Sequence, residues 1–301
     1  MVRTYRVAGH DFAIDFGVDF PFLKEVEMRY GPFELYEQSA ELLFDVAISD
    51  TEIDCGESSP VYTNQDDVKE GFITFSVFRT LDKSYYFEIT QPNSPLVNGR
   101  MLLSSDFAKV TLYLSGSDSD RWNTFNTAIN LSFQLATACH NTLLFHASAV
   151  EYKGSAYLFL GRSGTGKSTH SQMWIKAIDG VTLVNDDHPI VRVDNGNITV
   201  YGSPWSGKTH CYKNVHYPLG AIVRIVRAPH NRAIKLSPIE SYASIMTSCG
   251  GMVWERKLAD GRDLAIQAVI SQTPCWKMEC LPNEDAAVVA SAAVTKHRGR
   301  E

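Results

Sequence analysis

The sequence predicts an α/β protein, α+β over its whole length. A mostly antiparallel, β-rich region at residues 1–118 precedes a region with a mixed sheet at residues 119–301. Short apolar runs separated by polar breaks dominate the first region, and a long helical pattern follows it. A glycine-rich segment near residue 160 then stands between an apolar run and a second helical pattern. No linker divides the two regions, so the pattern also allows one continuous fold.

The β-rich region is predicted to begin with a hairpin, because the runs at residues 5–7 and 12–16 flank the turn residues Gly9 and His10. Glycine, proline and polar residues separate most of the apolar runs that follow. Further strands are expected at residues 42–48, 72–78, 85–89, 101–103 and 108–114.

The second region is predicted to alternate between helices and strands. Large apolar side chains recur at intervals of three and four over residues 119–138, which favours a helix. Ser237, Pro238 and Glu240 form the pattern of a capping box with proline at the first helical position. Strands are expected at residues 155–160, 183–188, 190–193, 198–201, 220–226 and 275–281, and helices at residues 168–178, 238–249 and 259–271.

Residues 161–168 match the phosphate-binding pattern G-x-x-x-x-G-K-[ST] without a mismatch. In such a loop the glycines let backbone N–H groups surround phosphate oxygens, the lysine reaches the outer phosphates, and the final hydroxyl holds Mg²⁺. The predicted strand before the loop and the predicted helix after it complete an anion site. The expected nucleotide-binding residues are Gly161, Ser163, Gly164, Thr165, Gly166, Lys167, Ser168 and Thr169.

Two flanking segments extend this pattern. His146-Ala147-Ser148-Ala149 precedes the loop, and an apolar run ending in Asp186-Asp187 follows its helix. The order H-A-S-A, S-G-T-G-K-S and D-D resembles the nucleotide core of HPr kinase/phosphorylase and of ATP-dependent phosphoenolpyruvate carboxykinase, over about residues 140–210. The resemblance implies a mixed-sheet P-loop kinase core. It also implies an ATP-dependent kinase whose acceptor is a hydroxyl, such as a serine, on a protein, a peptide or a small molecule.

The resemblance implies roles for four side chains. Lys167 would neutralise phosphate charge, and Asp187 or Asp186 would take the proton of the acceptor hydroxyl or hold metal. His146 and Asp187 would bind a second metal ion, for which Mn²⁺ suits an imidazole and a carboxylate. Without the resemblance, an aspartate pair after a strand often forms a turn or a cap, and a lone histidine after an apolar run is usually a packing residue. We expect His188 to be a surface-loop residue.

Three basic side chains downstream are further candidates. Lys208 lies in a second glycine–lysine segment, residues 202–209, whose spacing differs from that of a phosphate loop. The resemblance puts a loop near the acceptor at this point, so Lys208 is a candidate for contact with acceptor or phosphate. A solvated surface lysine is the alternative. Either Arg224 or Arg227 could face the transferring phosphate, and the sequence does not say which.

Composition argues against several classes of protein. With 28 basic and 34 acidic residues the net charge is −6, which argues against a general binder of nucleic acid or anionic membranes. No apolar window is long enough for a membrane span, and the N-terminus lacks the apolar core of a signal peptide. None of the six cysteines forms a C-x-x-C pair. A reduced cytoplasmic protein is therefore expected.

Two other functions remain compatible with the sequence. One is an ATP-binding regulatory or partner protein without transfer activity, although such a protein would not need both aspartates. The other is a P-loop NTPase. Carboxykinase activity is not expected, because the chain is shorter than those enzymes and their basic oxaloacetate-binding motifs are not recognisable. The sequence leaves open the acceptor, the oligomeric state, a homo-oligomer included, and the choice of donor among ATP, ADP, GTP and pyrophosphate.

Overall fold

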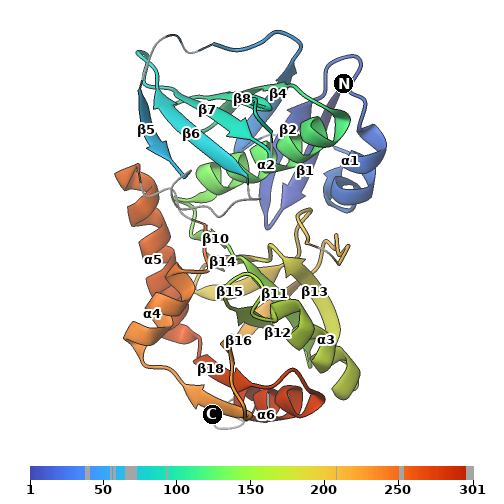
Figure 1. The fold of residues 1–301 in the computed structure, drawn as a ribbon, viewed down its shortest axis with the longest axis vertical. Helices are drawn as coiled ribbons and strands as arrows, with labels where there is room; N and C mark the ends of the chain where they lie inside the picture. Colours follow the sequence, from blue (N-terminus) through green and yellow to red (C-terminus); the bar gives the residue numbers. More distant parts are fainter. Residues whose placement is uncertain are drawn as a thin grey trace. The chain divides into compact units, whose positions relative to one another are not determined.

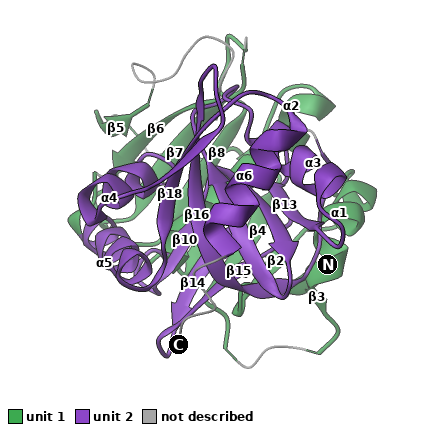
Figure 2. Ribbon diagram, turned by 90° about the horizontal axis from the view of Figure 1, so that it is seen from below, with its two compact units in different colours: residues 1–137, 252–256 green, residues 138–251, 257–301 purple. Residues whose placement is uncertain are grey.

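The computed structural model describes residues 1–37, 41–54, 56, 59–64, 73–92, 94–207, 209–250 and 254–295 (Figure 1). The chain divides into two compact units (Figure 2). The first comprises Met1–Thr137 and Met252–Arg256, and the second comprises Ala138–Gly251 and Lys257–Glu301. Both contain large sheets and helices, so the mixed α/β class predicted from the sequence is confirmed. No helix in the described residues is long and apolar enough to cross a membrane.

The first unit contains a sheet with the strand order β3-β1-β2-β4-β9-β8-β7-β6-β5. Its neighbouring strands are antiparallel except for the pairs β2–β4 and β4–β9, which are parallel. The predicted hairpin is formed by β1 and β2, with Val7 opposite His10. The strands are β1 (Val2–Val7), β2 (His10–Asp15), β3 (Glu34–Leu35), β4 (Phe44–Ser49), β5 (Pro60–Thr63), β6 (Thr74–Arg79), β7 (Tyr85–Thr90), β8 (Gly99–Leu103) and β9 (Lys109–Leu114).

The long predicted helix is α2 (Asp118–Thr137), and it belongs to the first unit. It contacts β4, β8 and β9, and its Phe125 packs against Phe16 and Phe20. The units therefore divide after Thr137, whereas the sequence analysis placed this helix in the second region. Its periodicity predicts a helix correctly but does not show which sheet its apolar face covers. Two shorter elements of this unit are α1 (Leu23–Tyr30) and the 3₁₀ turn η1 (Gly31–Phe33).

The second unit contains a mixed sheet with the order β10-β14-β15-β16-β12-β11-β13. β12 runs parallel to β16, β16 runs parallel to β18, and β17 pairs with β18. The strands are β10 (Thr142–Leu144), β11 (Ala147–Tyr152), β12 (Ser155–Leu160), β13 (Thr182–Asp187), β14 (Ile190–Asp194), β15 (Asn197–Tyr201), β16 (His216–Arg227), β17 (Arg232–Lys235) and β18 (Cys275–Cys280). The helices are α3 (Lys167–Ala177), α4 (Pro238–Met246), α5 (Arg256–Gln272) and α6 (Glu284–Thr295).

β12 is buried on both faces, which explains why its sequence is one continuous apolar run. Leu158 and Leu160 belong to the apolar cluster that includes residues of α5. Tyr157 and Phe159 belong to a second cluster, with Trp174 of α3 and residues of α6. The strand that leads into the glycine-rich loop is therefore fixed by packing from both sides.

The elements that were not predicted include the helices α1 and α6 and the strands β3, β5 and β17. In α6 the buried residues are Ala286, Ala287, Ala290 and Val294, which recur at helical intervals. The signal was present in the sequence, but small side chains make it weak. The five described cysteines, Cys139, Cys211, Cys249, Cys275 and Cys280, are free.

Candidate functional site

The candidate site lies at one edge of the sheet in the second unit. β12 and β13 are both antiparallel to β11, so their carboxyl ends meet at the same edge (Figure 1). Ala147, at the start of β11, pairs with Leu160 on one side and with Asp187 on the other. The register therefore brings together His146, the glycine-rich loop after Leu160, and the end of β13.

The glycine-rich loop needs glycine at two positions. Gly166 is the N-cap of α3 and has a φ of 111°, and Gly161 has a φ of 155°. A Cβ atom on Gly161 would lie 2.5 Å from the Thr165 hydroxyl, so a side chain there would displace the loop. Thr165 closes a turn, because its N–H and its hydroxyl both donate to the Arg162 carbonyl, at 3.1 and 2.6 Å. The loop has one defined path from β12 into α3.

The first turn of α3 supplies backbone donors. The N–H groups of Lys167, Ser168 and Thr169 open the helix and have no acceptor within it. Such N–H groups, together with the helix dipole, form an anion site. The residues predicted to bind nucleotide therefore form one continuous strand–loop–helix segment.

Lys167 is buried, with 8% of its surface exposed, and its amine faces the loop and the sheet edge. Its Nζ donates to the Gly161 carbonyl at 3.1 Å and contacts His146 Nε2 at 2.8 Å. Burial lowers the pKa of Lys167, while the carboxylates of Asp187 and Asp186 oppose this shift. The lysine is thus held at the loop by a carbonyl and an imidazole.

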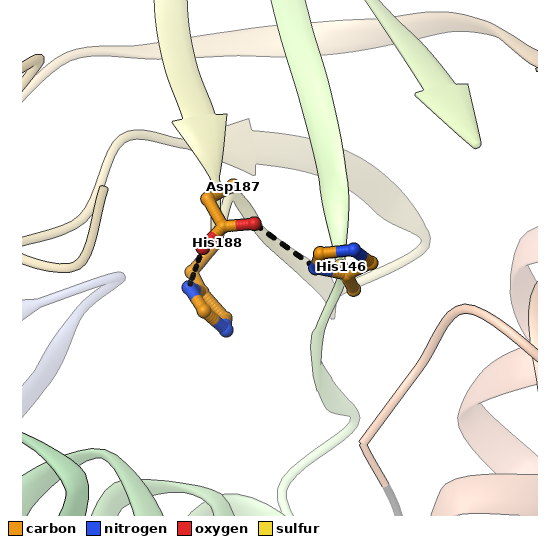
Figure 3. A group of neighbouring side chains, drawn as sticks. All are labelled: His146, Asp187 and His188. Atoms are coloured by element: carbon orange, nitrogen blue, oxygen red, sulfur yellow. Dashed lines mark ion pairs between the residues drawn. The ribbon is translucent and has the colours of Figure 1, made fainter. Parts of the chain in front are cut away.

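His146 joins Lys167 to Asp187. Because an ammonium group only donates, Nε2 of His146 accepts from Lys167, and the ring proton lies on Nδ1. That Nδ1 lies 3.0 Å from Asp187 Oδ1, and His188 Nδ1 lies 3.2 Å from Asp187 Oδ2 (Figure 3). Burial alone would raise the pKa of Asp187, but hydrogen bonds from His146 and His188 hold it well below its usual range. Asp187 is therefore ionised at neutral pH.

His146, Asp187 and His188 form a group with the chemistry of a metal site. Each offers one ligand atom, and these atoms all lie within 4.8 Å of one another. Two imidazoles and a carboxylate suit a transition metal such as Mn²⁺ better than they suit Mg²⁺. His188 was expected to be a surface residue, but it is half-buried and contacts its neighbour's carboxylate. Asp187, the residue directly before His188, has a φ of 127°. This backbone conformation is rare for residues other than glycine.

The segment from residue 202 to residue 207 folds back over the aspartate pair. The carbonyl of Asp186 accepts hydrogen bonds from the N–H of Gly207 at 2.6 Å and from the hydroxyl of Ser206 at 3.0 Å. A Cβ atom on Gly207 would lie 3.1 Å from that of Asp187, so glycine permits this close approach. Lys208, the candidate in this segment, lies outside the described residues.

Asn185 holds this segment in place, and the sequence analysis did not identify it. Its side chain is fully buried, and Nδ2 donates to the Trp205 carbonyl at 3.1 Å and to the Ser203 hydroxyl at 3.2 Å. Its Oδ1 accepts from the N–H of His188 at 2.9 Å. The sequence feature that points to Asn185 is an amide side chain within an apolar strand, directly before the aspartate pair.

The two candidate arginines have different contacts. Arg227 donates to the carbonyls of Gly164 and Thr165, and so it braces the loop backbone. Arg224 pairs in register with Leu160, the last residue before the loop, and donates to the Thr247 hydroxyl at 3.1 Å. Of these two arginines, Arg227 is therefore the one that contacts the glycine-rich loop.

No protein-family model matches the chain, and no curated protein matches it. Among solved structures, it is similar to the HPr(Ser) kinase/phosphatase from Coxiella burnetii, with 14% identity and a TM-score of 0.30. That similarity covers 52% of this chain and 95% of the other chain.

Proposed function

We propose that the protein is an ATP-dependent kinase that transfers the γ-phosphoryl group to a hydroxyl, such as a serine, of a protein, a peptide or a small molecule. The observation that supports this most is the chain of contacts from Lys167 through His146 to Asp187. It joins the glycine-rich loop, whose sequence fits the phosphate-binding pattern throughout, to a carboxylate with a lowered pKa at the same sheet edge. A module that only binds nucleotide has no need of this link.

The loop and Lys167 would bind the outer phosphates of ATP. The N–H groups at the start of α3 would donate to phosphate oxygens, and the Lys167 amine is positioned between the Gly161 carbonyl and His146. Ser168 would hold Mg²⁺, which supplies further positive charge to the phosphates. Phosphoryl transfer depends mainly on such positioning and charge neutralisation.

The acceptor hydroxyl would approach from the side of the aspartate pair. Its oxygen forms a bond to the γ-phosphorus as the bond to the bridging oxygen of ADP breaks, and its proton passes to Asp187 or Asp186. The low pKa of Asp187 makes it a weak base, so its main contribution is to orient the hydroxyl and to hold charge. In the loose transition state of phosphoryl transfer, little negative charge has to develop on the acceptor oxygen, so a strong base is not needed.

A transition metal would bind at His146, Asp187 and His188 in this proposal. The ligand atoms fit such an ion in kind and in spacing. The bound ion would supply positive charge next to the transferring group. His146 and His188 would then donate lone pairs to the metal in place of their hydrogen bonds to Asp187.

The decisive experiment incubates the purified protein with ATP and excess Mg²⁺, with and without a panel of serine peptides and small hydroxyl compounds. Acceptor-dependent formation of ADP, together with phosphate on the acceptor by mass spectrometry, is the expected result. ADP formed equally without acceptor would indicate a P-loop NTPase. Tight ATP binding with no turnover under any condition would indicate a regulatory protein.

A further inference from the structure

The first unit contains a cavity of about 290 Å³ at one edge of its sheet. β2, β4 and β9 run parallel, so their carboxyl ends lie at the same edge. Phe16 directly follows β2, Ser49 ends β4 and Leu114 ends β9, and all three residues line the cavity. The carboxyl ends of neighbouring parallel strands are where open sheets commonly bind ligands. Since small-molecule sites begin at about 300 Å³, the position and the volume favour a small ligand.

One side of the cavity is aromatic. Phe16, Phe20 and Phe22 line it and are themselves buried, and their ring centroids are 5.1 and 5.5 Å apart along the series. Aromatic rings pack against carbon chains and attract cations. The guanidinium of Arg121 already lies 5.4 Å from the centroid of the Phe22 ring. This wall therefore suits a ligand that has a carbon chain and a positive charge.

The cavity also carries negative charge that no side chain neutralises. Asp19 and Asp50 line it, and neither carboxylate has a hydrogen-bond or ion-pair partner among the described residues. Arg121 belongs to the wall as well, but its Nη2 donates to Asp118, outside the wall, at 2.5 Å. The charge of this arginine is thus already paired, and the two carboxylates of the wall are left for a ligand.

Other classes of ligand fit this cavity less well. An anion would meet the two carboxylates. The start of α2 offers it little compensation, because Ser117 and Asp120 accept from each other's backbone N–H groups, Oγ at 3.2 Å and Oδ2 at 3.1 Å. A metal ion needs more ligands than two, and within the described part of the chain Asp19 and Asp50 belong to no group of three that could hold one.

We propose that this cavity binds a small organic cation, a primary amine or a guanidine on a short carbon chain. The positive group pairs with Asp19 and Asp50, and the carbon chain packs against the phenylalanine wall. A free amine and a basic side chain of a polypeptide share this chemistry. The site belongs to the unit without the glycine-rich loop, so the inference does not depend on the proposed kinase activity.

Calorimetry of the full chain with three five-carbon probes tests this inference. Cadaverine carries an amine at each end, pentanediol is neutral, and glutarate carries two carboxylates. We expect cadaverine to bind with a Kd of about 1 mM or lower, and the other two probes not to bind. High salt should weaken the binding of cadaverine, because exposed charges are screened. Lysine with both main-chain ends blocked separates the two sources: tighter binding than cadaverine indicates a polypeptide, and weaker binding indicates a free amine.

Substitution of the two carboxylates locates the site. Asp19→Asn and Asp50→Asn should each weaken cadaverine binding about tenfold, and both positions are exposed, so the fold should tolerate the changes. Asp179→Asn removes an exposed aspartate of the second unit and should leave binding unaltered. An equal loss in all three variants would show that cadaverine responds only to net charge. That result, the absence of cadaverine binding by the wild type, or equal binding of pentanediol would overturn the inference.

Discussion

The amine of Lys167 lies 2.8 Å from Nε2 of His146, so the lysine of the glycine-rich loop donates to an imidazole. That imidazole in turn donates through Nδ1 to Asp187. The positive lysine and the negative aspartate together fix one neutral tautomer of the histidine between them. Any phosphate that draws the lysine toward the loop would therefore also change what His146 and Asp187 contact.

Replacement of Lys167 by alanine should weaken ATP binding. The substitution removes a buried ammonium group that would donate to the outer phosphates. We expect a loss of about 2 kcal/mol in binding free energy, or roughly a 30-fold increase in Kd. Isothermal titration calorimetry measures this directly. Lys235→Ala, which removes an exposed lysine of β17 in the same unit, should bind ATP as the wild type does. If the two variants bind ATP equally well, Lys167 does not contact phosphate.

Replacement of Asp187 by asparagine should abolish transfer while leaving ATP binding largely intact. The amide keeps the shape of the side chain but has lost the charge, and it can accept from only one of His146 and His188. We expect turnover to fall by roughly 10²-fold or more. Asp186→Asn is the matched comparison. If Asp187→Asn keeps near wild-type turnover and Asp186→Asn loses it, then Asp186 and not Asp187 orients the acceptor hydroxyl.

The glycine-rich loop and the strand and helix that flank it could be predicted because their pattern is local in the sequence. The pattern at residues 161–168 carries its own geometry, and the apolar runs beside it predict the strand and the helix that it needs. His146 and Asp187 were placed near it by resemblance. The register of β11 between β12 and β13 is the physical cause of that proximity.

His188 and Asn185 could not be placed in the same way. The contact of His188 with Asp187 depends on a backbone φ of 127° at a residue other than glycine, which no sequence pattern signals. The role of Asn185 depends on carbonyls that lie 18 and 20 residues further along the chain. The position of α2 likewise depends on which sheet is available to its apolar face. Each of these features is set by tertiary contacts rather than by local pattern.

Mn²⁺ should support transfer at least as well as Mg²⁺, and His146→Ala should erase the difference. Imidazole is a better ligand for Mn²⁺ than for Mg²⁺. Titration of Mn²⁺ followed by electron paramagnetic resonance gives a readout independent of turnover. We expect His188→Ala to weaken Mn²⁺ binding as well, since its ring nitrogen completes the group. His216→Ala removes an exposed histidine of β16 and should leave Mn²⁺ binding unaltered. The same metal dependence in wild type and in His146→Ala would make His146 a packing residue.

Acid should destabilise the protein through His170 before it affects Asp187. Burial lowers the pKa of His170 from 6.5 to about 4, so the unfolded chain binds the proton more readily than the folded one. Stability is then fully present above about pH 6.5 and falls as the pH decreases toward 4, by roughly 3 kcal/mol. The contribution of Asp187, whose pKa is lowered, is lost only as the pH falls below the usual pKa of an aspartate, so the two pH windows are separate.

Urea unfolding at pH 7 and at pH 4.5 measures the change in the free energy of unfolding. His170→Gln, which can still accept from the Trp174 indole but does not titrate, should lose much less stability between these two values. An equal loss in both proteins, or an NMR titration of His170 with a midpoint near 6.5, would show that its burial does not couple folding to pH.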